Sequence, residues 1–415
     1  MNTKTLLWAT AFGGLAALFA LPASAGTLTV LASFDGKNGS NPDGALIVSN
    51  TGELYGTTFS GGASTTCSGG CGTVFDLTPP ALGETAWSET VLTSFNGKNG
   101  AGPQGNLVAD NAGNLFGATE SGTIFRLAPP TAGKASWSET ILTRLTSKTG
   151  ADPLGSLLSD NAGNFYGAAV TGGALGSGTV FKLSPPSAGK TAWTVSVLVT
   201  FDVTNGRNPS SGLIADSTGN LYGMTSEGGA FGDGTVFEVT PPATGKKGWT
   251  ETVLTSFNGT NGASPFGGLI TDGKGNFYGT TSAGGTSNNG TVFKLSPPAA
   301  GNTTWSETVL TSFNGKDGQY PTGGLIADSA GNLYGTTQLG GAFTTSCIVG
   351  CGTVFKLTKP ATGKTAWKET VLASFNEKNG FIPVNNLIAD SAGNLYGTTY
   401  MGGAFGSGTM FEVTR

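Results

Sequence analysis

The sequence predicts an all-β fold, a seven-bladed β-propeller made of tandem repeats. The phrase DSAGNLYGTT at Asp328–Thr337 returns at Asp390–Thr399 and, in looser copies, along the chain about every 56 residues. Each copy holds four short apolar runs separated by Gly, Pro, Asn and Asp clusters, as expected for four strands joined by turns. No segment after residue 25 carries the 3.6-residue apolar period of a helix.

Seven copies can be counted from the residue that follows the fourth strand of each unit. That residue is Phe in every copy except one, where it is Leu: Phe34, Phe95, Leu145, Phe201, Phe257, Phe313 and Phe375. The order within a copy is constant, with an SFNGKNG turn followed by P-x-GGLIAD, AGNLYGTT, GTVFKL and WSETVL segments. A constant order of four strands over this period is typical of propeller blades.

The two ends of the mature chain are complementary. The stretch GTLTVLASF at residues 26–34 is in phase with WSETVLTSF at residues 87–95, so the mature chain starts on a fourth strand and ends after a third. We expect the N-terminal strand, about residues 26–34, to complete the last blade and remove an exposed sheet edge. An open β-solenoid, the alternative, would not need complementary ends. Residues 26–415 then form one domain of seven repeats.

The residues shared by all copies are expected to serve the fold. In the Asp-x-x-Gly-Asn turn, Asp can accept backbone hydrogen bonds and Gly tolerates positive φ, whereas a calcium loop would need more carboxylates. Tryptophan opens the fourth strand in six units, which indicates one repeated packing role more than six sugar-binding platforms. These residues are Trp87, Trp137, Trp193, Trp249, Trp305 and Trp367.

Residues 1–25 are predicted to be a secretory signal peptide. Lys4 precedes an apolar stretch from Leu6 to Leu21, and Ala23-Ser24-Ala25 forms an A-x-A cleavage site. A retained membrane anchor is the alternative, but the stretch is short and interrupted by glycines. We therefore expect an exported protein, extracellular or periplasmic, with no membrane anchor after cleavage.

The four cysteines form two Cys-x-x-x-Cys pairs, in units whose second-to-third strand connection is enlarged. In an exported chain these pairs predict two local disulfides, Cys67–Cys71 and Cys347–Cys351. A four-cysteine zinc site, the alternative, would need both pairs together, although one blade separates them, and the spacing is not that of a zinc ribbon. We expect no metal site and no cofactor.

The composition excludes several classes of function. With no histidine, the chain has neither a Ser-His-Asp triad nor a His-ligated zinc site. Charged residues make up 11% of the chain and the net charge is −4, without a basic patch, so nucleic acid is not an expected partner. What remains for an enzyme is carboxylate chemistry. The candidate carboxylates are Asp35, Asp202, Asp317 and Glu377, although their recurrence between units favours a turn role.

A binding site is expected where the copies differ. In antiparallel blades, the inter-blade turns and the second-to-third strand connections share one face, and this face collects most length variation and both cysteine pairs. Aromatic, Arg and Asp residues there would suit a carbohydrate or an extended peptide, and loop self-packing is the alternative. The residues proposed for the site are Arg207, Tyr320, Phe266, Phe381 and Glu120.

The repeated GGLIADSAGNLYGTT–GG–GTVFKLSPP unit resembles the GloVer tandem-repeat family of exported bacterial proteins, over residues 34–415. The resemblance implies no activity, and the lack of an anchor after the last repeat favours a soluble product. We expect a monomeric binding or scaffold module. The alternative is a carboxylate-dependent polysaccharide lyase or glycoside hydrolase.

Overall fold

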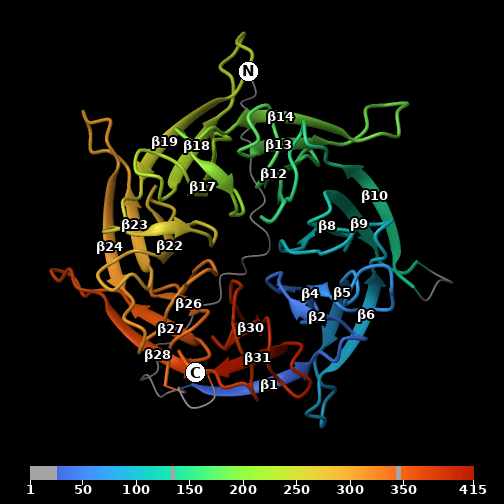
Figure 1. The fold of residues 1–415 in the computed structure, drawn as a ribbon. Coiled ribbons are helices and arrows are strands. Elements are labelled where there is room, and N and C mark those ends of the chain that lie inside the picture. Colours follow the sequence, from blue (N-terminus) through green and yellow to red (C-terminus); the bar gives the residue numbers. More distant parts are fainter. Residues whose placement is uncertain (1–25, 132–135, 343–346) are drawn as a thin grey trace.

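The computed structural model describes residues 26–131, 136–342 and 347–415. The chain forms seven antiparallel sheets arranged as blades around a central axis, which confirms the predicted propeller (Figure 1). In these residues there is no apolar helix of the length needed to cross a membrane. The predicted signal peptide lies outside the described residues.

The blades are numbered in chain order, and the strands of each are given from the axis outward. Blade 1 contains β2 (Ser40–Pro42), β3 (Ile47–Val48), β4 (Leu54–Ser60), β5 (Thr73–Thr78) and β6 (Ser88–Ser94). Blade 2 contains β7 (Val108–Ala109), β8 (Leu115–Ala118), β9 (Thr123–Ala128) and β10 (Ser138–Arg144). Blade 3 contains β11 (Leu158–Ser159), β12 (Phe165–Ala169), β13 (Thr179–Ser184) and β14 (Thr194–Thr200).

Blade 4 contains β15 (Arg207–Pro209), β16 (Ile214–Ala215), β17 (Leu221–Glu227), β18 (Thr235–Thr240) and β19 (Thr250–Ser256). Blade 5 contains β20 (Ala263–Pro265), β21 (Ile270–Thr271), β22 (Phe277–Ala283), β23 (Thr291–Ser296) and β24 (Ser306–Ser312). Blade 6 contains β25 (Ile326–Ala327), β26 (Leu333–Thr337), β27 (Thr353–Thr358) and β28 (Lys368–Ser374). Blade 7 contains β29 (Ile388–Ala389), β30 (Leu395–Thr399), β31 (Thr409–Thr414) and the N-terminal β1 (Thr27–Ser33).

The N-terminal strand closes the ring as predicted. Strand β1 pairs antiparallel with β31, from Thr27 opposite Thr414 to Ser33 opposite Thr409 (Figure 1). The pair contains a bulge between Val30 and Ala32, and the third and fourth strands of the other six blades show a bulge at the corresponding place. Strand β1 is therefore a regular outer strand supplied by the other end of the chain, and it pairs the edge of β31 that would otherwise be exposed.

The core is a repeated contact between aromatic rings and glycine. In each blade the Phe of the TVF or TMF segment, or of TIF in blade 2, is fully buried, as at Phe75 and Phe237. Its ring lies against the glycine of the LYG segment, where a Cβ on Gly56 would come within 2.5 Å of the Phe75 ring. A second Phe, which directly follows the fourth strand of the preceding blade, packs on the same ring, with centroids 5.1 Å apart for Phe34 and Phe75. The shared phrase therefore serves packing.

The shared tryptophans and aspartates also have structural roles. Each Trp packs against an aromatic residue of a second strand, as Trp137 does against Tyr55 with ring centroids 5.9 Å apart. In the turn after the inner strand, Asp328 Oδ1 accepts hydrogen bonds from the Ala330 and Asn332 N–H groups, at 3.0 and 2.9 Å. The hairpin role predicted for the Asp-x-x-Gly-Asn segment is confirmed.

Candidate functional site

Each inner strand is interrupted at the same proline. The residue before that proline has a left-handed backbone in all seven blades, with φ between 50° and 65°: Asn41, Gly102, Asp152, Asn208, Ser264, Tyr320 and Ile382. This conformation is uncommon for residues other than glycine, and least expected for the β-branched Ile382. A left-handed backbone at such residues costs energy, so the surrounding structure has to stabilise it.

The neighbouring blade holds this conformation. The N–H of Asn41 donates to Ser407 O at 2.8 Å, and that of Ser264 donates to Asp233 O at 2.9 Å. Bonds of this kind join the kink to the preceding blade in six of the seven blades, all but blade 3, so the chain cannot continue straight along the strand. The residues that follow the proline leave the ladder and face the axis instead.

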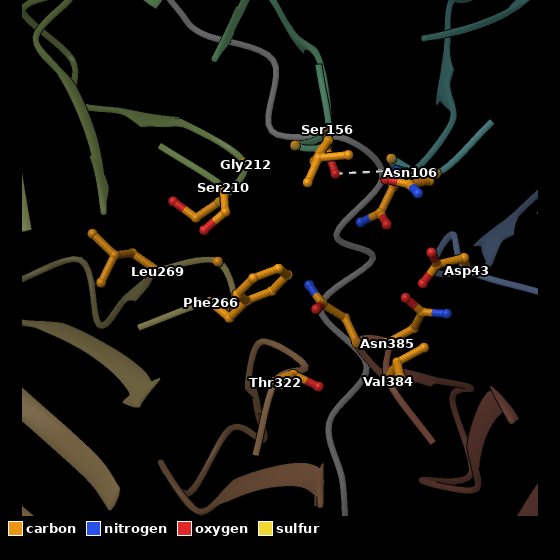
Figure 2. Close-up of a pocket in the computed structure, with 18 of the residues that line it drawn as sticks. Asp43, Asn106, Ser156, Ser210, Gly212, Phe266, Leu269, Thr322, Val384 and Asn385 are labelled. Carbon is orange, nitrogen blue, oxygen red and sulfur yellow. Dashed lines mark hydrogen bonds between the residues drawn. The ribbon is translucent and has the colours of Figure 1, made fainter. Parts of the chain in front are cut away.

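These axis-facing segments surround one cavity of about 380 Å³, named here the axial cavity (Figure 2). All seven blades contribute to its wall. One lining residue in each blade is the residue directly after the proline: Asp43, Gln104, Leu154, Ser210, Phe266, Thr322 and Val384. These seven positions are named the axial ring. They are structurally equivalent, yet each holds a different amino acid. The repeat therefore builds a symmetric frame around an asymmetric cavity.

On the side of blades 7, 1, 2 and 3, polar side chains of the wall bond to neighbouring segments. Asn106 Oδ1 accepts from the Ala45 N–H at 2.8 Å, and the Asn106 N–H donates to Ser156 Oγ at 3.3 Å. Asn385 Nδ2 donates to Thr398 Oγ1 at 3.0 Å. These contacts fix the side chains of Asn106 and Asn385 in place.

The side formed by blades 4, 5 and 6 is different. The third position after the proline holds Gly212, Gly268 and Gly324 in these blades. The Phe266 side chain is 42% exposed and its ring is directed into the cavity (Figure 2). Ser210, in the preceding blade 4, is 6% exposed, and its Oγ has no hydrogen-bond partner among the described residues. Next to Phe266, Gln338 Nε2 donates to Thr322 Oγ1 at 2.9 Å.

Asp43 is the one charged side chain among the described residues that line the cavity. Burial raises the pKa of its carboxyl to about 7, and the negative charge of Glu120 adds to this effect. Burial also raises the pKa of Tyr400, with Asp43 and Glu120 contributing. Asp43, Glu120 and Tyr400 come from blades 1, 2 and 7, so the three side chains influence one another where those blades adjoin.

The five residues proposed from sequence do not form one cluster. Phe266 lines the axial cavity. Glu120 is exposed and its carboxylate lies beside Gly102, at the edge of blade 2. Tyr320 is half-buried and holds the left-handed position before Pro321. Arg207 pairs with Glu227 at 3.5 Å on the loop face, the face of the inter-blade turns. Phe381 packs against the core of blades 6 and 7.

The other carboxylates considered from sequence lie in turns. Asp35 Oδ1 accepts from the Lys37 and Asn38 N–H groups, and these bonds lower the pKa of Asp35. Asp202 has the same arrangement with Thr204 and Asn205, and Asp317 accepts from the Asn314 N–H. None of these side chains lines the axial cavity among the described residues.

Both predicted disulfides are present, Cys67–Cys71 and Cys347–Cys351, with Cα–Cα distances of 5.2 and 5.5 Å. Each closes the enlarged β4–β5 or β26–β27 connection. Two disulfides suggest a compartment that is not reducing. No group of three or more acidic, Cys or His side chains in the described part of the chain could hold a metal ion.

The sequence matches the family described as the Gloeobacter/Verrucomicrobia repeat over residues 3–136, 119–349 and 246–415. No curated protein sequence matches the chain. Among solved structures, a proposed 6-phosphogluconolactonase from Bacteroides uniformis aligns with a TM-score of 0.52 and 13% identity, over 83% of this chain and 87% of that one. A calcium structure of Trichoderma reesei carbohydrate-active enzyme family AA12 aligns with a TM-score of 0.45 and 13% identity, over 100% of both chains. At 13% identity the first of these two alignments supports the fold alone.

Proposed function

The chain belongs to the Gloeobacter/Verrucomicrobia repeat family, and we propose that it is an exported binding module that takes its ligand in the axial cavity. The axial ring carries this proposal. Packing cannot explain seven different residues at seven equivalent positions, because the blades around them are nearly alike. Residues that vary on a rigid scaffold are where recognition is expected.

The lining favours a carbohydrate over an extended peptide. Its polar side chains are amides and hydroxyls with one carboxylate, and its apolar side chains are five aliphatic residues and one exposed aromatic ring. A volume of about 380 Å³ is at the small end of ligand pockets, which fits one or two sugar rings better than a peptide strand. An extended peptide binds most readily along an unpaired strand edge, and the kinked inner strands offer only short edges here.

Export is supported by the sequence and by the disulfides. Residues 1–25 have the n-region, apolar stretch and A-x-A site of a secretory signal. Both cysteine pairs are oxidised in the structure, as expected outside a reducing cytoplasm.

A blocking substitution tests this assignment. Nothing in the described residues lies within 4 Å of the place that a Cβ on Gly268 would take, and its φ is not positive, so Gly268→Trp should fill the cavity without disturbing the fold. Glycan-array hits of the wild-type protein should then be lost with an unchanged Tm. Thr303→Phe, on an exposed loop of the same blade away from the axis, is the control. Undiminished binding by Gly268→Trp would place the ligand elsewhere.

A second function, hydrolysis or elimination on a polysaccharide, is favoured by one observation. Asp43 lines the cavity with a pKa raised to about 7, and the charge of Glu120 is close enough to contribute. A carboxyl that stays protonated near neutral pH can act as a general acid. Asp43→Asn should then abolish product formation but keep glycan binding. The activity of the wild-type protein should fall as the pH rises through about 7. If bound glycans stay intact with the wild-type protein, the chain is a binding module only.

A further inference from the structure

Gly268 leaves open space in the wall of the axial cavity without a structural reason for being glycine. Most glycines in this fold have a structural reason, either a positive φ or a close backbone neighbour. Gly267 illustrates this, because a Cβ there would come within 2.6 Å of the Gly323 backbone. Gly268 has neither reason. Its missing side chain leaves room in the wall between blades 4 and 6.

Phe266 presents an exposed aromatic ring to the cavity. It lies two residues before this open position, and its ring is directed into the cavity (Figure 2). Nearly all other phenylalanines of the propeller core are fully buried in aromatic pairs, whereas the Phe266 side chain remains 42% exposed. An exposed apolar ring in a concave wall is a surface that a ligand can cover.

The hydroxyl of Ser210 is buried and has no hydrogen-bond partner in the described residues. Ser210 is 94% buried, since its exposed fraction is 6%, and its Oγ makes no hydrogen bond within the described residues. A buried hydroxyl without a partner is unfavourable unless a ligand or water supplies one. The adjacent Ser211 differs, because its Oγ accepts from the Met224 N–H at 3.0 Å.

We propose that the Ser210–Phe266–Thr322 side of the axial cavity binds one neutral pyranose ring, seated over Gly268. The inference rests on the proposed function, and it deepens it by naming the ligand class and the side of the cavity. A pyranose has an apolar face of C–H groups and an edge of hydroxyls. The apolar face covers Phe266, while hydroxyls at the edge bond Ser210 on one side and the Thr322–Gln338 pair on the other.

The charge distribution explains why the sugar is neutral. Among the described lining residues, the single charged side chain is Asp43, which lies across the cavity in blade 1. No cation is therefore available to pair with a uronate or a sulfated sugar, and no carboxylate adjoins Phe266 to pair with an amino sugar. Recognition depends on stacking and neutral hydrogen bonds.

The two adjacent serines provide a matched test. Ser210→Ala removes a hydroxyl with no protein partner, so its Tm should stay equal or rise slightly, while affinity for a neutral pyranoside falls about fivefold to tenfold. Ser211→Ala removes a hydroxyl that has a partner, so its Tm should fall. A Ser210→Ala protein with a lowered Tm and unchanged affinity would show that the hydroxyl serves the fold.

The aromatic contact is tested by Phe266→Leu and Phe266→Trp. Leu keeps apolar volume but lacks the flat ring, and should weaken binding about tenfold, whereas Trp should preserve it. Phe231→Leu, at an exposed phenylalanine of the β17–β18 loop, is the control. The probes are methyl α- and β-pyranosides of glucose, galactose and mannose and their short oligomers, measured by calorimetry beside methyl glucuronide and glucosamine.

The outcomes separate the inference from the proposed function. Loss of binding in Gly268→Trp together with full binding in Phe266→Leu and Ser210→Ala would keep the axial cavity and overturn this subsite. Preference for the charged sugars, or binding of an extended peptide library without any sugar, would also overturn it. Weaker neutral-sugar binding in both variants, with Tm preserved, supports it.

Discussion

Two sets of positions occur once per blade and behave in opposite ways. The Phe in each third strand is the same residue in all seven blades and is fully buried: Phe75, Phe125, Phe181, Phe237, Phe293, Phe355 and Phe411. The axial ring differs in every blade and lines a cavity. Where identical neighbours pack on each other, only one side chain fits. Where the blades surround open space, nothing in the fold constrains the residue.

The same substitution at the two sets should have the largest difference in effect. Phe237 and Phe266 lie in adjacent blades, the first fully buried against Phe201 and the second 42% exposed. Phe237→Ala should lower the free energy of unfolding by about 3–5 kcal/mol, because it opens a cavity in the core. Phe266→Ala should change it by less than about 1 kcal/mol. Denaturant titration measures both, and equal losses would remove the distinction between the two sets.

The disulfide loops provide a smaller test, because they are additions to two blades and not part of the repeat. Replacing Cys67 and Cys71 by Ser should cost about 2 kcal/mol, as expected for a short closed loop, and should make the β4–β5 connection a preferred site of proteolysis. The expected cleavage lies within residues 61–72, with the rest of the ring intact. Global unfolding of this variant at room temperature would contradict a local role for the disulfide.

The smallest effect concerns a repeated acid on the outer strand. Glu89, Glu251, Glu307 and Glu369 are half-buried, and burial raises the pKa of each to about 7. Three of them accept a hydrogen bond from an Asn of an inter-blade turn, as Glu307 Oε2 does from Asn261 Nδ2 at 2.5 Å. In all four, Oε1 is buried and has no partner in the described residues.

The sign of the pH effect follows from the direction of these shifts. Between the ordinary pKa of 4.5 and about 7 the folded chain holds more protons than the unfolded chain, so stability falls as the pH rises through this window. The Tm should be higher at pH 5 than at pH 8, and Glu307→Gln should reduce the difference. A Tm that is highest at pH 8 would contradict the assignment.

Most of the fold could be predicted from the sequence, because each strand and turn pattern occurs in several copies of the repeat. The phase shift between GTLTVLASF and WSETVLTSF predicted that β1 would close blade 7. The spacing of the cysteine pairs predicted both disulfides. The equivalence of six tryptophans predicted their packing role.

The site was harder to predict, because its geometry depends on a backbone feature without a sequence signature. A left-handed residue before proline is disfavoured, and residues as unlike as Asn41, Tyr320 and Ile382 adopt it. Of the residues predicted from unusual loops, Phe266 alone lines the axial cavity, and Ser210 and Asp43, which also line it, were not among those predicted. Aligning the copies at the proline would have shown the one position that differs in all seven.

An alanine scan of the axial ring, with affinity for a bound glycan and Tm measured on each variant, is the most direct test of the claim that these positions serve recognition and not the fold. We expect a near-constant Tm across the ring, with the affinity lost mainly at Ser210, Phe266 and Thr322. A ring whose substitutions lower the Tm and leave the affinity unchanged would contradict it.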